Sequence, residues 1–213
     1  MAGHGERGAA LVVALLLGLL LVALTAALVP LSTIETEVAA NHRRSVEGLY
    51  AAEAAAALAA AELGGLADWS VVLDGSFRSA RWGASLAPTM PDGRTVDLAA
   101  VAGLLRARGA GGDDAGRGLA WTLLAHGDLA SWVGLPPGFG PWLVAVWAAN
   151  DPADADGAPL VDSNGALVLH AAAFGPRGAS RALQATLVRQ VLTPPTPAPP
   201  VVRSRLISQR VVR

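Results

Sequence analysis

The sequence contains no cysteine and no lysine, and each absence excludes a class of chemistry. Without cysteine, the chain forms no disulfide and has no thiolate that could act as a nucleophile or metal ligand. All 16 basic residues are arginine, so the chain lacks the amine needed for a Schiff base or a GxxxxGK phosphate loop. The formal net charge of −1 argues against a general binder of polyanions.

Catalytic motifs are also scarce. The four histidines are isolated in the sequence, and no pair has the spacing of a zinc site. The chain has no GxSxG nucleophile elbow and no glycine-rich phosphate loop after an expected strand. The six tryptophans are better explained as packing residues than as a ligand stack. We therefore expect a protein that is not an enzyme and that needs no cofactor.

One long apolar run lies near the N-terminus. Residues 8–34 carry no charge, and residues 11–31 consist only of Leu, Val, Ala, one Gly, one Thr and one Pro. About 20 helical residues cross a bilayer core of roughly 30 Å, so this run is long enough to span a membrane. The simplest alternative is a cleaved secretory signal, but its apolar region is usually only about 7–15 residues long. We expect a transmembrane helix over residues 9–34.

The same helix is expected to continue well beyond the apolar run. Nine of the eleven residues 51–61 are alanine, the best helix former, and Gly64-Gly65 is a stop signal. We predict a helix from about residue 9 to about residue 63, with an amphipathic second part over residues 35–64. Pro30 removes one backbone hydrogen bond inside this helix, which predicts a kink there.

The second part of the helix has an apolar face at the helical period. At 100° per residue this face holds Val46, Leu49, Tyr50, Ala54, Ala57 and Ala61. We expect a sheet to cover the side that carries Val46, Tyr50 and Ala57. Glu53 falls in the middle of this face, where an unpaired buried carboxylate is costly. We therefore treat Glu53 as an interaction residue that is either paired or at the edge of the contact.

Residues 66–213 are enough for one compact extracytoplasmic domain. The patterns predict a helix over 96–108, strands over 69–77, 142–149, 166–174 and 182–191, and an edge strand over 201–212. Residues 119–133 fit either a strand or a short helix. A Gly/Asp-rich loop is expected over 109–118, and five prolines in 193–200 predict a stiff segment that cannot pair. The expected fold class is α+β, with a long N-terminal helix packed on a C-terminal antiparallel sheet and one short helix.

Acidic and amide side chains crowd one expected loop between two strands. Hard oxygen ligands at this density suit Ca²⁺, although their spacing departs from an EF-hand loop. The alternative is a solvated turn built from residues that favour turns. The weak candidates for a calcium site are Asp151, Asp154, Asp156 and Asp162.

Charge is separated along the C-terminal part of the chain. No acidic residue follows Asp162, whereas seven arginines do. Arginine arrays neutralise nucleic-acid phosphates, but these are not interleaved with aromatic residues, so nucleic acid is an unlikely partner. Contact between oppositely charged patches of neighbouring subunits is a better use of this pattern. The simplest explanation is that these arginines face solvent.

The N-terminal pattern then resembles a known family. A short leader, MAGHGERG, ends in Gly8, the apolar helix begins at Ala9, and Pro30 is residue 22 counted from Ala9. The runs ERGAALVVALLLGLLLVAL and ETEVAANHRRSVEGLYAAEAA follow, with Asn41, Arg43 and the AEA element at 52–54. Over about residues 5–60 this pattern is similar to the type IV pilins and pseudopilins, and to PilX-type minor pilins in particular.

The resemblance implies a processing route and a location. A prepilin peptidase would remove residues 1–8 after Gly8 and methylate Ala9. The chain would lie in the inner membrane as a single-pass protein, with its C-terminal domain outside the cytoplasm. Its partners would be other pilin subunits, the pilus assembly machinery and the lipid bilayer, and it could be incorporated in the pilus.

The resemblance also has one departure. Most pilins carry glutamate at the fifth residue after the cut, whereas this chain has Val13. We expect a minor pilin-like structural subunit of a type IV pilus or pseudopilus that initiates or caps assembly. The alternative is a single-pass membrane protein whose extracytoplasmic binding domain never polymerises.

Overall fold

The computed structural model describes residues 5–109, 119–136, 140–192 and 201–212. The chain divides into two units, Met1–Arg43 and Arg44–Arg213, and the helix that begins the chain contributes to both. The helices are α1 (Gly5–Leu63), α2 (Ser70–Leu73), α3 (Leu98–Gly109), α4 (Leu129–Trp132) and the 3₁₀ turn η1 (Pro176–Gly178). The strands are β1 (Thr122–Asp128), β2 (Leu143–Asn150), β3 (Ala166–Phe174), β4 (Ser180–Leu192) and β5 (Val201–Val212).

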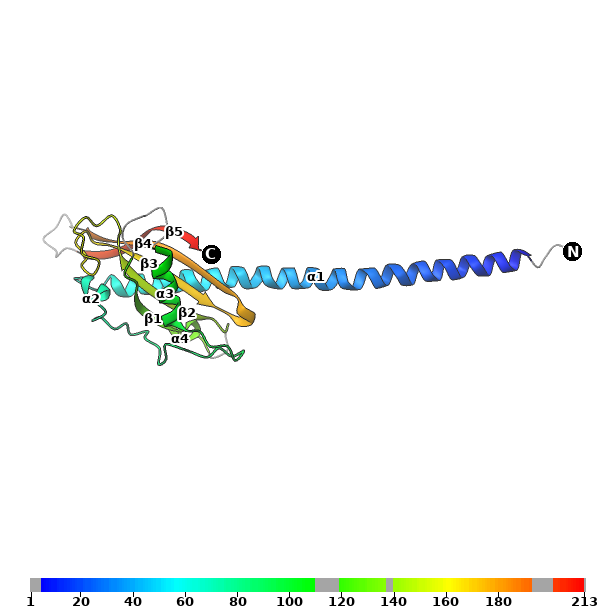
Figure 1. Ribbon diagram of the computed structural model, residues 1–213, viewed down its shortest axis with the longest axis horizontal. Coiled ribbons are helices and arrows are strands. Elements are labelled where there is room, and N and C mark those ends of the chain that lie inside the picture. The colour runs from blue at the N-terminus through cyan, green and yellow to red at the C-terminus, as the bar shows by residue number, and fades with distance from the viewer. Residues whose placement is uncertain (1–4, 110–118, 137–139, 193–200, 213) are drawn as a thin grey trace. The chain divides into compact units, whose positions relative to one another are not determined.

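The five strands form one antiparallel sheet in the order β1-β2-β3-β4-β5 (Figure 1). Strands that are neighbours in sequence are neighbours in space, as in a meander. A bulge interrupts the β4–β5 ladder between Thr186 and Leu187. Together with α1, this sheet confirms the α+β class.

Most elements match the sequence patterns. The long helix, the helix of α3 and the strands β2, β3, β4 and β5 are confirmed, and residues 119–133 divide into β1 followed by α4. The strand expected over 69–77 is wrong, because this segment forms the short helix α2 and then a loop. The segment 193–200 and most of the loop 109–118 lie outside the described residues.

In the second unit, the last part of α1 packs on one face of the sheet through its smallest side chains. Trp69 and Leu63 close this core at the helix end, and Val144, Val146 and Leu187 come from the sheet. The buried positions of α1 repeat with helical spacing: Gly48, Ala51, Ala52, Ala55, Ala56, Ala59, Ala60 and Leu63.

The face of α1 that meets the sheet therefore differs from the predicted one. Tyr50 is 64% exposed, and Val46, Ala57 and Ala61 are exposed too. The contact uses instead a Gly/Ala stripe on another side of the helix. Its small side chains leave room for larger residues, such as Trp142 just before β2, to pack against the helix.

The other face of the sheet is covered mainly by α3. Alternate residues of β2 point to opposite sides, so Val144 and Val146 face α1 while Ala145 and Trp147 face α3. All eight residues of β2 are buried, as expected for a strand covered on both faces. The second unit is thus a three-layer arrangement of helix, sheet and helix (Figure 1).

Candidate functional site

The first unit supplies a helix that is long and apolar enough to cross a membrane. The span covers Gly8–Ala26, with a mean hydropathy of 2.8, and none of it is buried by the rest of the protein. Among the described residues it is the one helix with these properties. Its leucine and valine side chains are exposed, which is unfavourable in water and favourable in a bilayer.

The predicted processing residues lie at the start of this span. Gly8 and Ala9 are helical and exposed, and a Cβ added at Gly8 would meet no atom within 4 Å. Val13 is 55% exposed on the same helix. The Thr25 hydroxyl hydrogen-bonds to the carbonyl oxygens of Leu21 and Val22, at 3.0 and 2.9 Å, so its proton is held by its own helix.

The helix assignment of α1 continues through Pro30 without interruption. The predicted kink at Pro30 stays a prediction.

The two glutamates near the end of α1 have very different surroundings. Glu53 is half-buried, and among the described residues none donates a hydrogen bond or forms an ion pair with it. The carboxylate of Glu62 instead accepts from Ser79 Oγ at 2.8 Å, the Ala80 N–H at 2.8 Å and Arg81 Nη1 at 2.9 Å. Sequence reasoning missed this contact, because nothing in the pattern links Glu62 to a loop that follows it.

The acidic loop between β2 and β3 uses its carboxylates to hold its own backbone. Asp154 is buried and accepts from the Ser163 hydroxyl at 2.5 Å and the Ser163 N–H at 2.9 Å. These hydrogen bonds lower the pKa of Asp154 to about 2, because they favour its charged form. Asp151 and Asp156 accept from the N–H groups of Ala153 and Ala158 two residues on, as aspartates in tight turns do.

The fourth calcium candidate, Asp162, is tied to the sheet. Its side chain is only 2% exposed and accepts from the N–H groups of Gly165 and Ala166 and from Arg189 Nη2 at 3.3 Å. Burial raises the pKa of Asp162, and Arg189 opposes that shift. Over the described ranges, no group of three or more His, Asp or Glu side chains is placed to hold a metal ion. The arrangement is a turn cross-linked by hydrogen bonds.

Comparison with known proteins finds a similarity in the N-terminal part of the chain. Residues 7–57 match the family model described as PilX N-terminal. No curated protein and no solved structure matches the chain. The matched residues cover the apolar span of α1 and most of the part that packs on the sheet. Residues 7–57 are therefore similar to the N-terminal segment of the PilX family.

Proposed function

We propose that the chain is a minor pilin-like structural subunit of a type IV pilus or pseudopilus that initiates or caps assembly. The observation that carries this proposal is one continuous helix, α1, in the segment that matches the PilX family. Its first part is an exposed apolar span, and its last part packs on a sheet through a Gly/Ala stripe. This division suits a subunit that is anchored in the inner membrane and carries a folded domain outside it.

The place in the assembly rests on Val13. In pilins the glutamate at this position neutralises the positive N-terminus of a neighbouring subunit, as the resemblance implies. An isolated charge in hydrocarbon costs several kcal/mol, and a nearby opposite charge offsets much of that cost. Val13 cannot supply this charge, and Thr25, the nearest polar side chain inside the apolar span, is about three turns further along the helix. Such a subunit suits the tip or a priming complex better than a long shaft.

The proposal is for a structural role and not a catalytic one. Its partners are other pilin subunits, the prepilin peptidase, the assembly machinery and lipid. The alternative, a single-pass protein with a binding domain that never polymerises, shares the anchor but not the processing.

The intact mass of the protein extracted from membranes tests the proposal. Loss of residues 1–8 together with N-methylation of Ala9 is the expected result. An intact leader would instead support the non-polymerising alternative. Cleavage near residues 26–32 would show a secretory signal and contradict both.

A further inference from the structure

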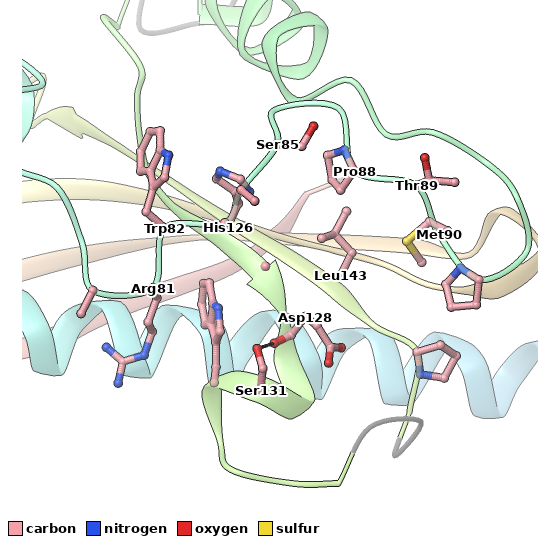
Figure 2. Close-up of a pocket in the computed structure, with 17 residues that line it drawn as sticks. Arg81, Trp82, Ser85, Pro88, Thr89, Met90, His126, Asp128, Ser131 and Leu143 are labelled. Carbon is pink, nitrogen blue, oxygen red and sulfur yellow. Dashed lines mark hydrogen bonds between the residues drawn. The ribbon is translucent and has the colours of Figure 1, made fainter.

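A pocket in the second unit has no role in the pilin proposal. It measures about 780 Å³ and lies between the loop 80–91, the strands β1 and β2, and α4. Figure 2 shows Trp82 and His126 side by side at one end, with Pro88, Thr89 and Met90 following along the loop and Asp128 and Ser131 opposite them. Leu143 forms part of the floor. This volume exceeds what one side chain needs and is in the range of ligand sites.

Hydrogen bonds at both ends of the loop 80–91 hold the walls of the pocket in place. At one end, the Glu62 carboxylate accepts hydrogen bonds from Ser79, Ala80 and Arg81. The backbone N–H of His126 also donates to the Arg81 carbonyl at 3.3 Å. At the other end, the Met90 N–H donates to the Arg94 carbonyl at 2.7 Å. A pocket that is already formed loses less conformational entropy when a ligand binds.

Glycines let two aromatic rings line the pocket. A Cβ on Gly83 would lie 2.7 Å from the ring of His126, and a Cβ on Gly127 would lie 2.8 Å from Nε1 of Trp132. His126 is 1% exposed, and burial lowers its pKa, so this ring is uncharged at neutral pH. The pocket therefore presents indole and proline rings over an apolar floor, and the buried ring of His126 makes an edge contact with Trp82, with centroids 5.2 Å apart.

The charges of the pocket select against anionic ligands. Arg81 is the one arginine in the lining, and its guanidinium is already bound to Glu62 at 2.9 Å. The carboxylate of Asp128 is exposed at the rim. Among the lining residues, a phosphate or a carboxylate would thus meet the Asp128 carboxylate and no unpaired cation, whereas an uncharged ligand would meet no such penalty. Outside the lining, the guanidinium of Arg78 lies over the ring of Trp82, 5.2 Å from its centroid.

We propose that this pocket binds an uncharged, proline-rich peptide segment of a partner protein in the polyproline II conformation. Such segments dock on aromatic-lined grooves, and their rigid backbone keeps the entropic cost of binding low. Proline has no N–H, so the ligand mainly offers carbonyl acceptors, which suit the indole N–H of Trp82 and the hydroxyl of Thr89. The polar side chains of the lining, among them Ser85, Asp128 and Ser131, would also suit the hydroxyls of a neutral saccharide, and the experiment tests this alternative.

The chain itself contains a sequence of this type, which provides the probe. Residues 193–200, TPPTPAPP, hold five prolines and no charge. The experiment titrates the full-length protein in detergent micelles against this peptide with a fluorescent label, followed by anisotropy. We expect binding with a Kd below about 1 mM, and at least tenfold weaker binding of the peptide TAATAAAA.

Two variants and a matched control locate the binding. Thr89→Arg adds bulk and charge at an exposed position of the rim and should weaken binding at least tenfold, as should Trp132→Ala. Thr95→Arg is the control, because Thr95 is exposed, pairs with Thr89 in an isolated bridge and does not line the pocket. Circular dichroism checks that each variant is folded. If Trp132→Ala is not folded, the result with Thr89→Arg decides the test.

Four results would overturn the proposal. The first is that the proline-rich peptide does not bind up to 1 mM, and the second is that TAATAAAA binds equally well. The third is that Thr89→Arg binds the peptide as tightly as the wild type does. The fourth is that maltotriose displaces the peptide at a similar concentration. The last result would assign the pocket to a neutral saccharide. None of these results bears on leader cleavage, so the peptide proposal can fail while the pilin proposal stands.

Discussion

The guanidinium of Arg189 lies over the indole ring of Trp69, with its Cζ 4.6 Å from the ring centroid. The same group donates from Nη1 to the carbonyl of Ala67 at 2.9 Å and from Nη2 to Asp162 at 3.3 Å. One side chain of β4 thus joins the segment after α1 to the acidic loop. The contact combines a cation–π interaction, a planar hydrogen-bonding fork and an ion pair.

Replacement of Arg189 should therefore destabilise the second unit strongly. Arg189→Met keeps much of the apolar stem but leaves the Asp162 carboxylate buried without its ion-pair partner, so we expect a loss of about 2–3 kcal/mol. Arg189→Lys should recover only part of the lost stability, because lysine lacks the planar guanidinium that donates to two acceptors at once. Chemical denaturation of the two variants measures both effects. A loss below about 0.5 kcal/mol for Arg189→Met would show that the contact is incidental.

Gly48 of α1 should be required for packing even though glycine weakens a helix. A Cβ at this position would lie 2.8 Å from the indole of Trp142. Gly48→Ala gains about 1 kcal/mol of helix propensity but overpacks a core contact, which typically costs about 1–3 kcal/mol. We expect a net loss of stability. Gly103→Ala in α3 is the control: a Cβ there meets no atom within 4 Å, and the variant should be more stable.

Glu53 and Glu62, the two glutamates near the end of α1, form a second matched pair. Glu62 receives three hydrogen bonds and its side chain is 16% exposed, so Glu62→Ala leaves three donors unpaired. We expect a loss of about 1–3 kcal/mol, and well under 1 kcal/mol for Glu53→Ala. Thermal unfolding of both variants measures the difference. Equal losses would mean that the contacts of Glu62 contribute little.

The low pKa of Asp154 predicts a loss of stability in acid. Its pKa of about 2 in the folded protein is below that of an unfolded aspartate, near 3.9, so the folded state binds fewer protons between these values. The contribution of Asp154 is therefore complete above about pH 4 and is lost as the pH falls towards 2. Asp154→Asn should flatten the decline of the denaturation midpoint between pH 4 and 2. Asp156→Asn, at an exposed position of the same loop, should leave that decline unchanged.

The strands and the long helix follow from local patterns, whereas the contacts between them do not. Leu183, Ala185 and Leu187 alternate along β4 and face one core, as expected for a half-covered strand. The apolar residues of 69–77 suggested a strand, but Trp69 and Val72 are buried from a short helix instead, because tertiary packing overrides local propensity.

The site residues show the same limit. The apolar span 8–26 is visible in the sequence because its signal is continuous. Apolarity alone does not identify the Gly/Ala stripe of α1 as the contact face. The larger apolar side chains lie on a different face of the helix from the small residues that pack on the sheet. The pocket joins the loop 80–91 to His126 and Leu143, and no periodicity connects segments so far apart in the chain.

Val13→Glu tests the proposed place in the assembly. Glutamate at this position would supply the charge that a neighbouring N-terminus needs inside the membrane, so the variant should enter the shaft more often. The measurement is the abundance of this chain relative to the major subunit in purified pili. We expect the wild-type chain to be rare and Val13→Glu to be enriched several-fold, with Val13→Gln, which lacks the charge, close to wild type. Wild-type filaments built from this chain alone would refute the argument, and an unchanged abundance of Val13→Glu would mean that contacts elsewhere set its place.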